Sequence, residues 1–277
     1  MKRIAIIITV FNRKQHTLQC LKNIEGQTIQ SKKNYKVEIY LTNDGCTDGT
    51  PEAIRTLFPY VNIIEGDGTL FWNRGMYAAW QEAAKNNYDF YLWLNDDTLL
   101  KSDAIERLLE CSEGKNDESV IIGSCCSSAN EKEITYGGHS KDGKLLKDVN
   151  NEQECIIFNG NIVLIPKYIF KEIGFNDKRY RHAWGDYDYS LMVYRKGLKS
   201  YVAKGVFGAC DLHTNKPKWS DSRVKLSERW KAFHKPGGNG SNPFELFHYR
   251  KKHYGVFPAC LTFVSNYIHV LFPKLWE

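Results

Sequence analysis

The fold that we expect for this chain follows from one stretch of its sequence, Tyr88-Asp89-Phe90-Tyr91-Leu92-Trp93-Leu94-Asn95-Asp96-Asp97. Its first seven residues are mostly apolar and predict a buried strand. An amide and two carboxylates follow at the point where that strand ends. In an open α/β sheet, ligands bind outside the carboxyl ends of the strands, and two acids there can hold a hard divalent cation. The alternative is a turn that caps the next helix, since Asp and Asn are common in caps.

Strand-like and helix-like segments alternate through the first half of the chain. Runs of apolar residues predict strands, and apolar residues at helical spacing predict helices. The predicted strands are 3–10, 36–41, 61–64, 88–94 and, later, 155–166; helices are predicted at 14–25, from residue 50, and at 72–85. Strands separated by helices form parallel βαβ units. We therefore predict an α/β fold with a Rossmann-like, mostly parallel sheet, flanking helices and a basic helical tail.

Composition is that of an ordinary globular chain of 277 residues, with 42% hydrophobic and 25% charged residues. Eight cysteines occur without a Cys-x-x-Cys pair, which favours a reduced, cytoplasmic protein over a zinc site or a disulfide framework. The apolar run after Met1 is too short for a signal peptide and predicts a strand instead. The chain has no clean apolar run of 18 residues, so we expect no membrane-spanning helix.

Positive charge gathers near the C-terminus. The net charge is +6, and residues 216–253 carry ten Lys or Arg against three Asp or Glu. This distribution favours an anionic partner, such as a phospholipid surface or a phosphorylated acceptor, over nucleic acid; a solvated helical face is the alternative. Farther along, Leu261, Val264, Ile268 and Leu271 share one face of a predicted helix. That face suits an interfacial membrane anchor, or packing on the core or on a second subunit of a homodimer.

Four polar segments call for a common explanation. They are residues 9–13 after the first strand, 43–50 after the second, 95–97 after the strand at 88–94, and 184–188 at the start of a predicted helix. In a parallel sheet, the first three lie at the same edge. We therefore expect one ligand site built from segments that are far apart in the sequence.

These segments resemble the motifs of family 2 glycosyltransferases. The most specific are Thr-Val-Phe-Asn-Arg at 9–13 and Asp-Gly-Cys-Thr-Asp-Gly-Thr at 44–50, and the resemblance covers about residues 3–253. It implies the GT-A fold and an inverting hexosyl- or deoxyhexosyltransferase that uses a nucleotide-diphosphate sugar. It also implies a rhamnosyltransferase-like enzyme of bacterial capsule or O-antigen synthesis, with a saccharide or lipid-linked saccharide as acceptor.

The resemblance assigns a set of residues to the donor. Phe11 would wall the base, Arg13 would lie near phosphate, and Asp44 would accept the imide N–H of uracil or thymine, which implies a UDP- or dTDP-linked sugar. Arg74 would bridge to the diphosphate; a surface arginine is the alternative. The expected nucleotide-sugar contacts are Thr9, Phe11, Arg13, Asp44, Gly68, Arg74, Asn95 and Asp96. Asp48 is expected to be structural.

The resemblance also assigns the metal and the acceptor side. Asp97 matches the acid that binds Mg²⁺ or Mn²⁺, and His213 would complete the metal site or be structural. Asp186 matches the catalytic base, with Asp188 as the competing candidate and an expected acceptor contact. Trp184 would stack on the acceptor sugar or be an ordinary buried tryptophan. Two residues depart from the family pattern: Asn95 and Gly185 stand where acids are usual.

We expect a transferase domain over 1–235, with a nucleotide-sugar half of about 1–125 and an acceptor half of about 126–235, and a basic amphipathic extension over 236–277. The expected location is the cytoplasm, with peripheral contact to the inner face of the plasma membrane. Two rival functions remain. A nucleotidyltransferase should carry a glycine-rich phosphate loop with a lysine after the first strand, where this chain has Phe11-Asn12-Arg13. A non-catalytic sugar-nucleotide-binding domain would be compatible with Asn95 and Gly185.

Overall fold

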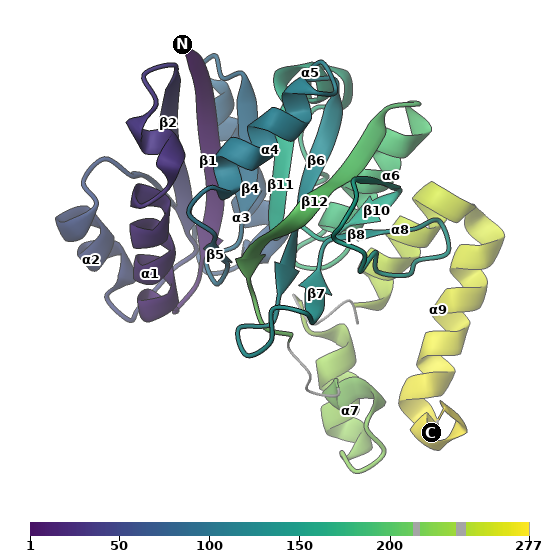
Figure 1. Cartoon of the computed structure of the whole chain (residues 1–277). Helices are drawn as coiled ribbons and strands as arrows, with labels where there is room; N and C mark the ends of the chain where they lie inside the picture. Colours follow the sequence, from purple (N-terminus) through teal and green to yellow (C-terminus); the bar gives the residue numbers. More distant parts are fainter. Residues whose placement is uncertain (213–216, 237–241, 277) are drawn as a thin grey trace.

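A curled sheet with helices on both faces forms the body of the molecule (Figure 1). The computed structural model describes residues 1–212, 217–236 and 242–276. Within them the sheet has the strand order β3-β2-β1-β4-β11-β6-β12-β5, and β7 and β9 extend it at β6 and β12. The strands are β1 (Lys2–Val10), β2 (Tyr35–Asn43), β3 (Asn62–Glu65), β4 (Phe90–Leu94), β5 (Leu99–Leu100), β6 (Ser119–Cys126), β7 (Ile134–Tyr136), β8 (Gly138–His139), β9 (Gln153–Cys155), β10 (Ile157–Phe158), β11 (Ile162–Pro166) and β12 (Lys199–Ala209).

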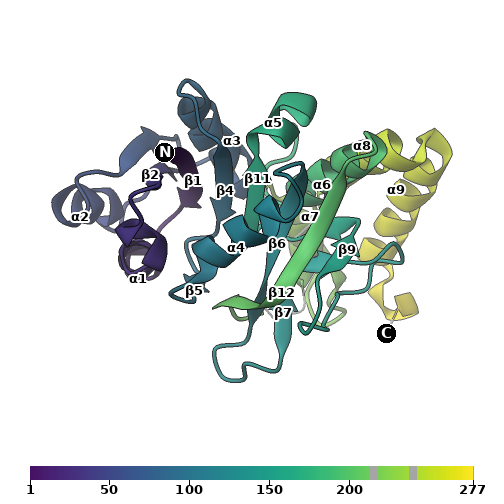
Figure 2. The same ribbon diagram turned by 45° about the horizontal axis from the view of Figure 1, so that its top comes forward.

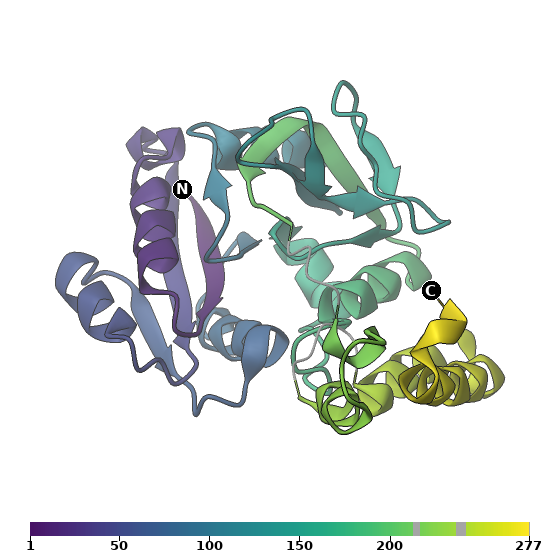
Figure 3. The same ribbon diagram turned by 90° about the horizontal axis from the view of Figure 1, so that it is seen from below.

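Helices alternate with the first strands along the chain, and further helices follow the last strand. The helices are α1 (Lys14–Glu25), α2 (Thr50–Leu57), α3 (Phe71–Ala84), α4 (Ala104–Glu113), α5 (Lys167–Ile173), α6 (Gly185–Arg195), α7 (Leu226–His234), α8 (Pro243–Tyr254) and α9 (Val256–Leu271). Figure 2 shows α1 and α3 on opposite faces of the sheet. Figure 3, from below, shows α1 and α2 at one end of the molecule and α7, α8 and α9 toward the other.

The first four strands in spatial order, β3, β2, β1 and β4, run parallel. Thr9 pairs with Thr42 and Ile7 with Trp93, so the carboxyl ends of β1, β2 and β4 reach one edge of the sheet. The mostly parallel α/β sheet predicted from the sequence is therefore confirmed. It brings the polar segments after these strands together, as βαβ geometry requires.

Alternation along the strands explains why the sheet is buried on both faces. Ile4 and Ile6 of β1 pack on the side of α1, α2 and α4, whereas Ala5 and Ile7 pack on the side of α3, α5 and α6. The core on the side of α3, α5 and α6 is rich in aromatic residues. The ring centres of Trp80 on α3 and Trp93 on β4 lie 5.4 Å apart. Strands covered on both faces have nearly continuous apolar sequences, which is why the run at 88–94 predicts a strand so clearly.

The prediction of one continuous strand over residues 155–166 is wrong. This stretch is divided into β9, β10 and β11, and the polar segment Asn159-Gly160-Asn161 separates the last two. A Cβ on Gly160 would lie 2.4 Å from the Trp72 ring, so this turn passes too close to α3 for a larger residue. The interruption places Asn159 and Gly160 at the sheet edge where the polar segments meet.

The C-terminal helices contact the rest of the chain closely. Tyr249 of α8 packs with Tyr180 and Leu191, and Arg229 of α7 donates hydrogen bonds to the carbonyl oxygens of Val270 and Leu271 at the end of α9. The domain boundary at residue 235 stays a prediction, but these contacts cross it. Residues 1–212, 217–236 and 242–276 include no helix with the length and hydropathy that a membrane span needs.

Candidate functional site

A cavity of about 890 Å³ lies at the carboxyl edge of the parallel strands. Its walls come from the segments after β1, β2 and β4, from the Asn159–Asn161 turn, and from the start of α6. The predicted site residues that line it are Thr9, Phe11, Arg13, Asp44, Gly68, Asn95, Asp96, Asp97, Trp184 and Asp186. The topology thus brings together four segments that the sequence alone could only associate by their position after strands.

The acid pair at the end of β4 lies deep in this cavity. Asp96 is 3% exposed and accepts a hydrogen bond from the Thr17 hydroxyl at 3.1 Å. Arg13 pairs with both acids: its Nη1 lies 3.2 Å from Asp96 Oδ1, and its Nη2 pairs with Asp97 Oδ2. Burial raises the pKa of Asp96 to about 6, and the Arg13 charge opposes this shift. The Cys210 thiol donates toward Asp97 Oδ1 at 3.6 Å.

Asn95 has a definite partner in the cavity wall. Its Oδ1 accepts a hydrogen bond from the Trp72 indole N–H at 2.7 Å. A carboxylate could accept the same bond, so the indole does not require the amide. The effect of Asn95 is on charge, because this turn carries two carboxylates, Asp96 and Asp97, rather than three.

Asp44 holds a neighbouring loop in place. Its side chain is 2% exposed; Oδ1 accepts from the backbone N–H groups of Gly68 at 2.9 Å and Leu70 at 3.2 Å, and Oδ2 accepts from Phe71 at 2.8 Å. Gly68 has φ +84°, and the loop it belongs to leads into α3. Asp44 therefore fixes the loop that forms this wall of the cavity. Each carboxylate oxygen has two lone pairs, so Oδ2 keeps capacity for a base N–H.

Asp186 lies in the first turn of α6 and faces the cavity. Its Oδ2 accepts from the Gly160 N–H at 3.0 Å and its Oδ1 from the Tyr187 N–H at 2.9 Å. Burial raises the pKa of Asp186 to about 6, although these backbone hydrogen bonds and the charge of His139 lower it. A carboxylate with this pKa is ionised at neutral pH and basic enough to accept a proton.

Close packing explains the glycine that precedes Asp186. A Cβ on Gly185 would lie 1.9 Å from Oδ1 of Asn73 on α3. Asn73 is fully buried and donates hydrogen bonds to the carbonyl oxygens of Asp177 and Tyr180. The start of α6 therefore packs directly on α3. The acid that is usual in the family at this position does not fit beside Asn73.

Asp188 is not among the described residues that line the cavity, and its expected acceptor contact stays a prediction. Its side chain is fully buried and bonded to Tyr180 Oη at 3.0 Å, Lys252 Nζ at 2.8 Å and His253 Nε2 at 2.7 Å. Lys252 and His253 belong to α8. Asp188 therefore joins the C-terminal helices to α6, and Asp186 is the member of this acid pair that faces the cavity.

Two further expectations have different outcomes. Arg74, on α3, is also absent from the described cavity lining; its Nε donates to the Lys178 carbonyl at 2.8 Å, so it holds the 176–184 segment instead of facing a diphosphate. His213 lies outside the described residues, and its metal role stays a prediction. Trp184, with φ +71°, lines the cavity, and its ring centre lies 4.8 Å from that of Tyr249.

Several cavity residues escaped the sequence reasoning. They are Phe71, Tyr136, Asn159, His182, Tyr187 and Lys235, whereas Trp72 belongs to the stretch 72–75 that resembles the lining of the family's donor pocket. Asn159 and Asn161 were detectable, because polar residues interrupt an apolar run at 155–166. Tyr136 comes from the polar segment 127–153, whose composition predicts a hairpin or loop over the site without indicating which residue reaches it. Lys235 comes from beyond α7, and nothing local indicated that it reaches the site.

Asp96 and Asp97 form an oxygen-rich pair of a kind that suits Mg²⁺ or Mn²⁺. In the described part of the chain, no cluster of three or more His, Cys, Asp or Glu could enclose a metal ion by itself. Mg²⁺ is commonly bound through one or two carboxylates together with substrate phosphates and water. The pair therefore fits a cation that arrives with a diphosphate, and not one enclosed by protein ligands.

Comparison with solved structures gives the class of fold. TarS of S. aureus has a TM-score of 0.60 at 10% identity over 98% of this chain and 55% of that chain, so this chain spans about half the length of TarS. TarS 1–349 in complex with UDP-GlcNAc has a TM-score of 0.56 at 11% identity, covering 97% and 73% of the two chains. The mannosyltransferase PcManGT of Pyrobaculum calidifontis, in complex with GDP-Man and Mn²⁺, has 0.57 at 13% identity, covering 99% and 82%. These likenesses show the GT-A fold.

The family follows from the sequence match. The family model described as Glycosyl transferase family 2 matches residues 5–174, which is more than half of the chain. Among curated proteins, none matches the chain. The chain belongs to glycosyl transferase family 2 and has the GT-A fold.

Proposed function

We propose that this protein transfers a hexosyl or deoxyhexosyl group, with inversion, from a UDP- or dTDP-linked sugar to a hydroxyl of a saccharide acceptor. The observation that carries the proposal is that one cavity is lined by Asp186 and by the Asp96–Asp97 pair. The first is a base with a raised pKa, and the pair suits the charge of a diphosphate. Solved relatives of the fold bind UDP-GlcNAc and GDP-Man, which supports a nucleotide-sugar donor.

In this mechanism the donor base lies against Phe11 and the Asp44 loop. Asp96 and Asp97 would hold Mg²⁺ or Mn²⁺, which would supply positive charge against the leaving diphosphate. Asp186 accepts the proton of the acceptor hydroxyl as its oxygen attacks the anomeric carbon from the opposite side. Trp184 and Tyr187 line the cavity beside Asp186 and supply flat faces for the acceptor sugar.

The test is a panel of UDP- and dTDP-sugars with Mn²⁺ or Mg²⁺, with release of nucleotide diphosphate as the readout. Asp186→Asn should keep donor binding and lose about 10²–10⁴-fold in turnover, the usual contribution of a general base. Asp142→Asn, on an exposed loop, is the charge-matched control and should be unaffected. Donor binding without turnover across the whole panel would favour the non-catalytic alternative. Retention of the anomeric configuration in the product would exclude inversion.

We further propose that α9 rests on an anionic membrane surface, where a lipid-linked acceptor of capsule or O-antigen type is found. Phe257, Leu261 and Val264 are 73%, 56% and 56% exposed, and Ile268 and Leu271 continue the same face. Residues 246–276 contain four Lys or Arg and no Asp or Glu. An exposed apolar stripe with this charge is typical of a helix that lies in the interface.

Flotation with vesicles tests this proposal. We expect binding to vesicles that contain anionic lipid, weaker binding to neutral ones, and loss of binding in the Leu261→Ser/Val264→Ser variant. The control variant is Leu57→Ser, an exposed apolar residue at the other end of the molecule. If the double variant instead dissolves a dimer and leaves vesicle binding unchanged, the face is a subunit interface and the membrane proposal is wrong.

A further inference from the structure

Arg13 occupies the position between the two carboxylates that would hold the cation. Its Nη1 lies 3.2 Å from Asp96 Oδ1, and its Nη2 pairs with Asp97 Oδ2, so one guanidinium bridges both acids. Without Arg13 the pair would carry two negative charges in a largely buried position. A guanidinium and a divalent cation at the same two carboxylates compete for the same lone pairs.

The backbone of Arg13 is fixed, but its side chain has room to move. Its carbonyl oxygen accepts hydrogen bonds from the N–H and the hydroxyl of Thr17, both at 3.0 Å, at the start of α1. The side chain is 37% exposed, whereas those of Asp96 and Asp97 are 5% and 16% exposed. Arg13 can therefore leave the acids by rotating its long side chain, without any change in the loop.

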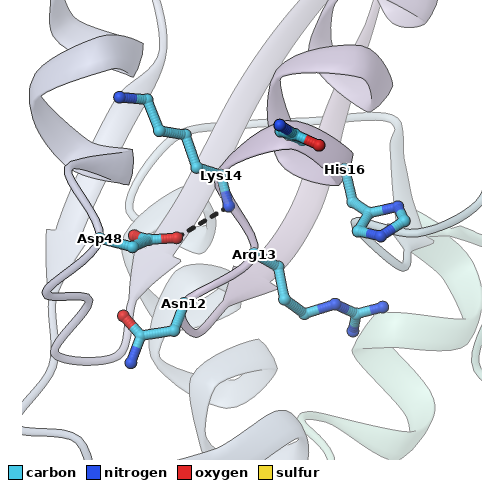
Figure 4. A pocket seen from close by; sticks show the side chains of 6 residues that line it. Asn12, Arg13, Lys14, His16 and Asp48 are labelled. Carbon is cyan, nitrogen blue, oxygen red and sulfur yellow. Dashed lines mark hydrogen bonds between the residues drawn. The ribbon is translucent and has the colours of Figure 1, made fainter.

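A second, shallower hollow adjoins Arg13 on the outer side of the loop. It has a volume of about 530 Å³, and Asn12, Lys14, His16 and Asp48 line it together with Arg13. In Figure 4 the Arg13 side chain extends away from Asp48 and Lys14. Arg13 borders both hollows.

We propose that Arg13 is an internal competitor of the cation, which neutralises Asp96 and Asp97 while the donor is absent and moves to the diphosphate when donor and cation bind together. The proposal rests on the function proposed above. A diphosphate can accept two hydrogen bonds from the guanidinium, and these replace the hydrogen bonds that Arg13 makes to the carboxylates. The consequence is a coupling: cation binds weakly to the donor-free protein, and the nucleotide strengthens it.

Titration with Mn²⁺, followed by electron paramagnetic resonance of the unbound ion, tests the proposal without any turnover. We expect Arg13→Gln to bind Mn²⁺ about ten- to a hundredfold more tightly than wild type when no nucleotide is present, since one charge-assisted bridge is removed. The same variant should bind UDP or dTDP more weakly in the absence of metal. The strengthening of Mn²⁺ binding by UDP should be smaller than in wild type.

Two variants serve as controls. Lys14→Gln removes the same charge one residue away, from a side chain outside the main cavity, and should leave Mn²⁺ affinity near the wild-type value. Arg13→Lys keeps the charge but cannot bridge both acids, so its Mn²⁺ affinity should be intermediate. Thermal unfolding of each variant shows whether it is folded.

The outcomes separate this proposal from the proposed function. If Arg13→Gln and wild type bind Mn²⁺ equally without nucleotide, and UDP strengthens both equally, Arg13 does not compete and the metal-dependent transferase stands. If Lys14→Gln tightens Mn²⁺ binding as much as Arg13→Gln does, general charge is the cause and the proposal is overturned. If no variant binds Mn²⁺ even with UDP, both this proposal and the metal-binding role of the acid pair are overturned.

Discussion

Asp186 and Asp188 lie two residues apart on α6, and their side chains have different surroundings. One faces the cavity and accepts two backbone N–H groups; the other is fully buried and pairs with Lys252 and His253. A helix turns by about 100° per residue, so side chains two apart point to nearly opposite faces. The same sequence motif therefore provides one carboxylate that faces the cavity and one that is buried among structural contacts.

The raised pKa of Asp186 predicts an acid limit of activity. Its pKa moves from 3.8 to about 6 because burial disfavours the charged form, with His139 and the neighbouring backbone N–H groups opposing the shift. The base is active only when ionised, so kcat/KM for the acceptor at saturating donor should be flat above pH 6 and fall about tenfold per unit below it. A profile that stays flat down to pH 4.5 would contradict the role of Asp186.

Substitution of Asp188 should lower the stability of the fold without removing a group that takes part in the proposed reaction. Asp188→Ala leaves Tyr180 and His253 without their buried partner, although Lys252 keeps Asp177 at 3.2 Å, and leaving a buried polar group unpaired costs about 1–3 kcal/mol. Urea unfolding should show this loss. Asp142→Ala, at an exposed position, should change the free energy of unfolding little. An Asp188→Ala protein with wild-type stability and no acceptor binding would support the predicted acceptor role and contradict the structural one.

Among the elements, α3 and α6 depend on each other at a single close contact. Asn73 on α3 donates hydrogen bonds to the Asp177 and Tyr180 carbonyls, and Gly185 at the start of α6 lies against its amide. This contact sets where α6 begins, and so where Asp186 points. The segment from Asn176 to Trp184 therefore connects α3 to the start of α6.

Gly185→Ala should be poorly tolerated. The added Cβ would lie 1.9 Å from Asn73 Oδ1, and overpacking of this kind costs about 1–3 kcal/mol. Turnover should fall as well, because Asp186 must shift with the helix start. Gly26→Ala is the matched control: its φ is −79° and the nearest atom to its Cβ is 3.6 Å away, so chemical denaturation should give nearly wild-type stability. Equal stability of the two variants would contradict the packing argument.

In the molecule as a whole, the helices beyond residue 235 help to support the acceptor side. Lys252 and His253 hold Asp188, Glu245 accepts from the Arg181 N–H at 3.2 Å, and Tyr249 stacks near Trp184. By contrast, α9 contacts the remainder mainly through α8 and α7 and keeps an apolar face exposed. Its loss should therefore affect the cavity much less than the loss of α8.

Two truncations test this difference. A chain that ends at Gly255 keeps α8, so donor turnover with a water-soluble acceptor should stay within a few-fold of wild type, while vesicle binding is lost. A chain that ends at Asn242 lacks Lys252 and His253, the partners of Asp188, and it also lacks Glu245, which accepts from the Arg181 N–H. It should unfold at lower temperature and lose turnover. Thermal melts and turnover of both chains are the measurements. Full activity of the shorter chain would show that α8 is dispensable.

Local patterns in the sequence were sufficient for much of this protein. The strand that ends at Leu94, the parallel sheet and the gathering of the segments after β1, β2 and β4 all follow from apolar runs and from βαβ geometry, because those signals are contained in short stretches. The resemblance to the family, and not local pattern, assigned Asp44, Asp97 and Asp186, which all line the cavity. It also assigned Arg74 and Asp188, which are not among the described residues that line it.

Those two side chains turn away from the cavity because of contacts made by distant residues. Arg74 bonds to Lys178, and Asp188 bonds to residues 64 and 65 positions farther along the chain. The bridge from Arg13 to Asp97 joins residues 84 positions apart, and the fit of Gly185 against Asn73 is equally nonlocal. Such contacts depend on how helices pack, and no short stretch of sequence encodes that. Which of the two acids faces the cavity was therefore decided by tertiary packing, whereas the edge of the sheet that carries the polar segments was evident from local pattern.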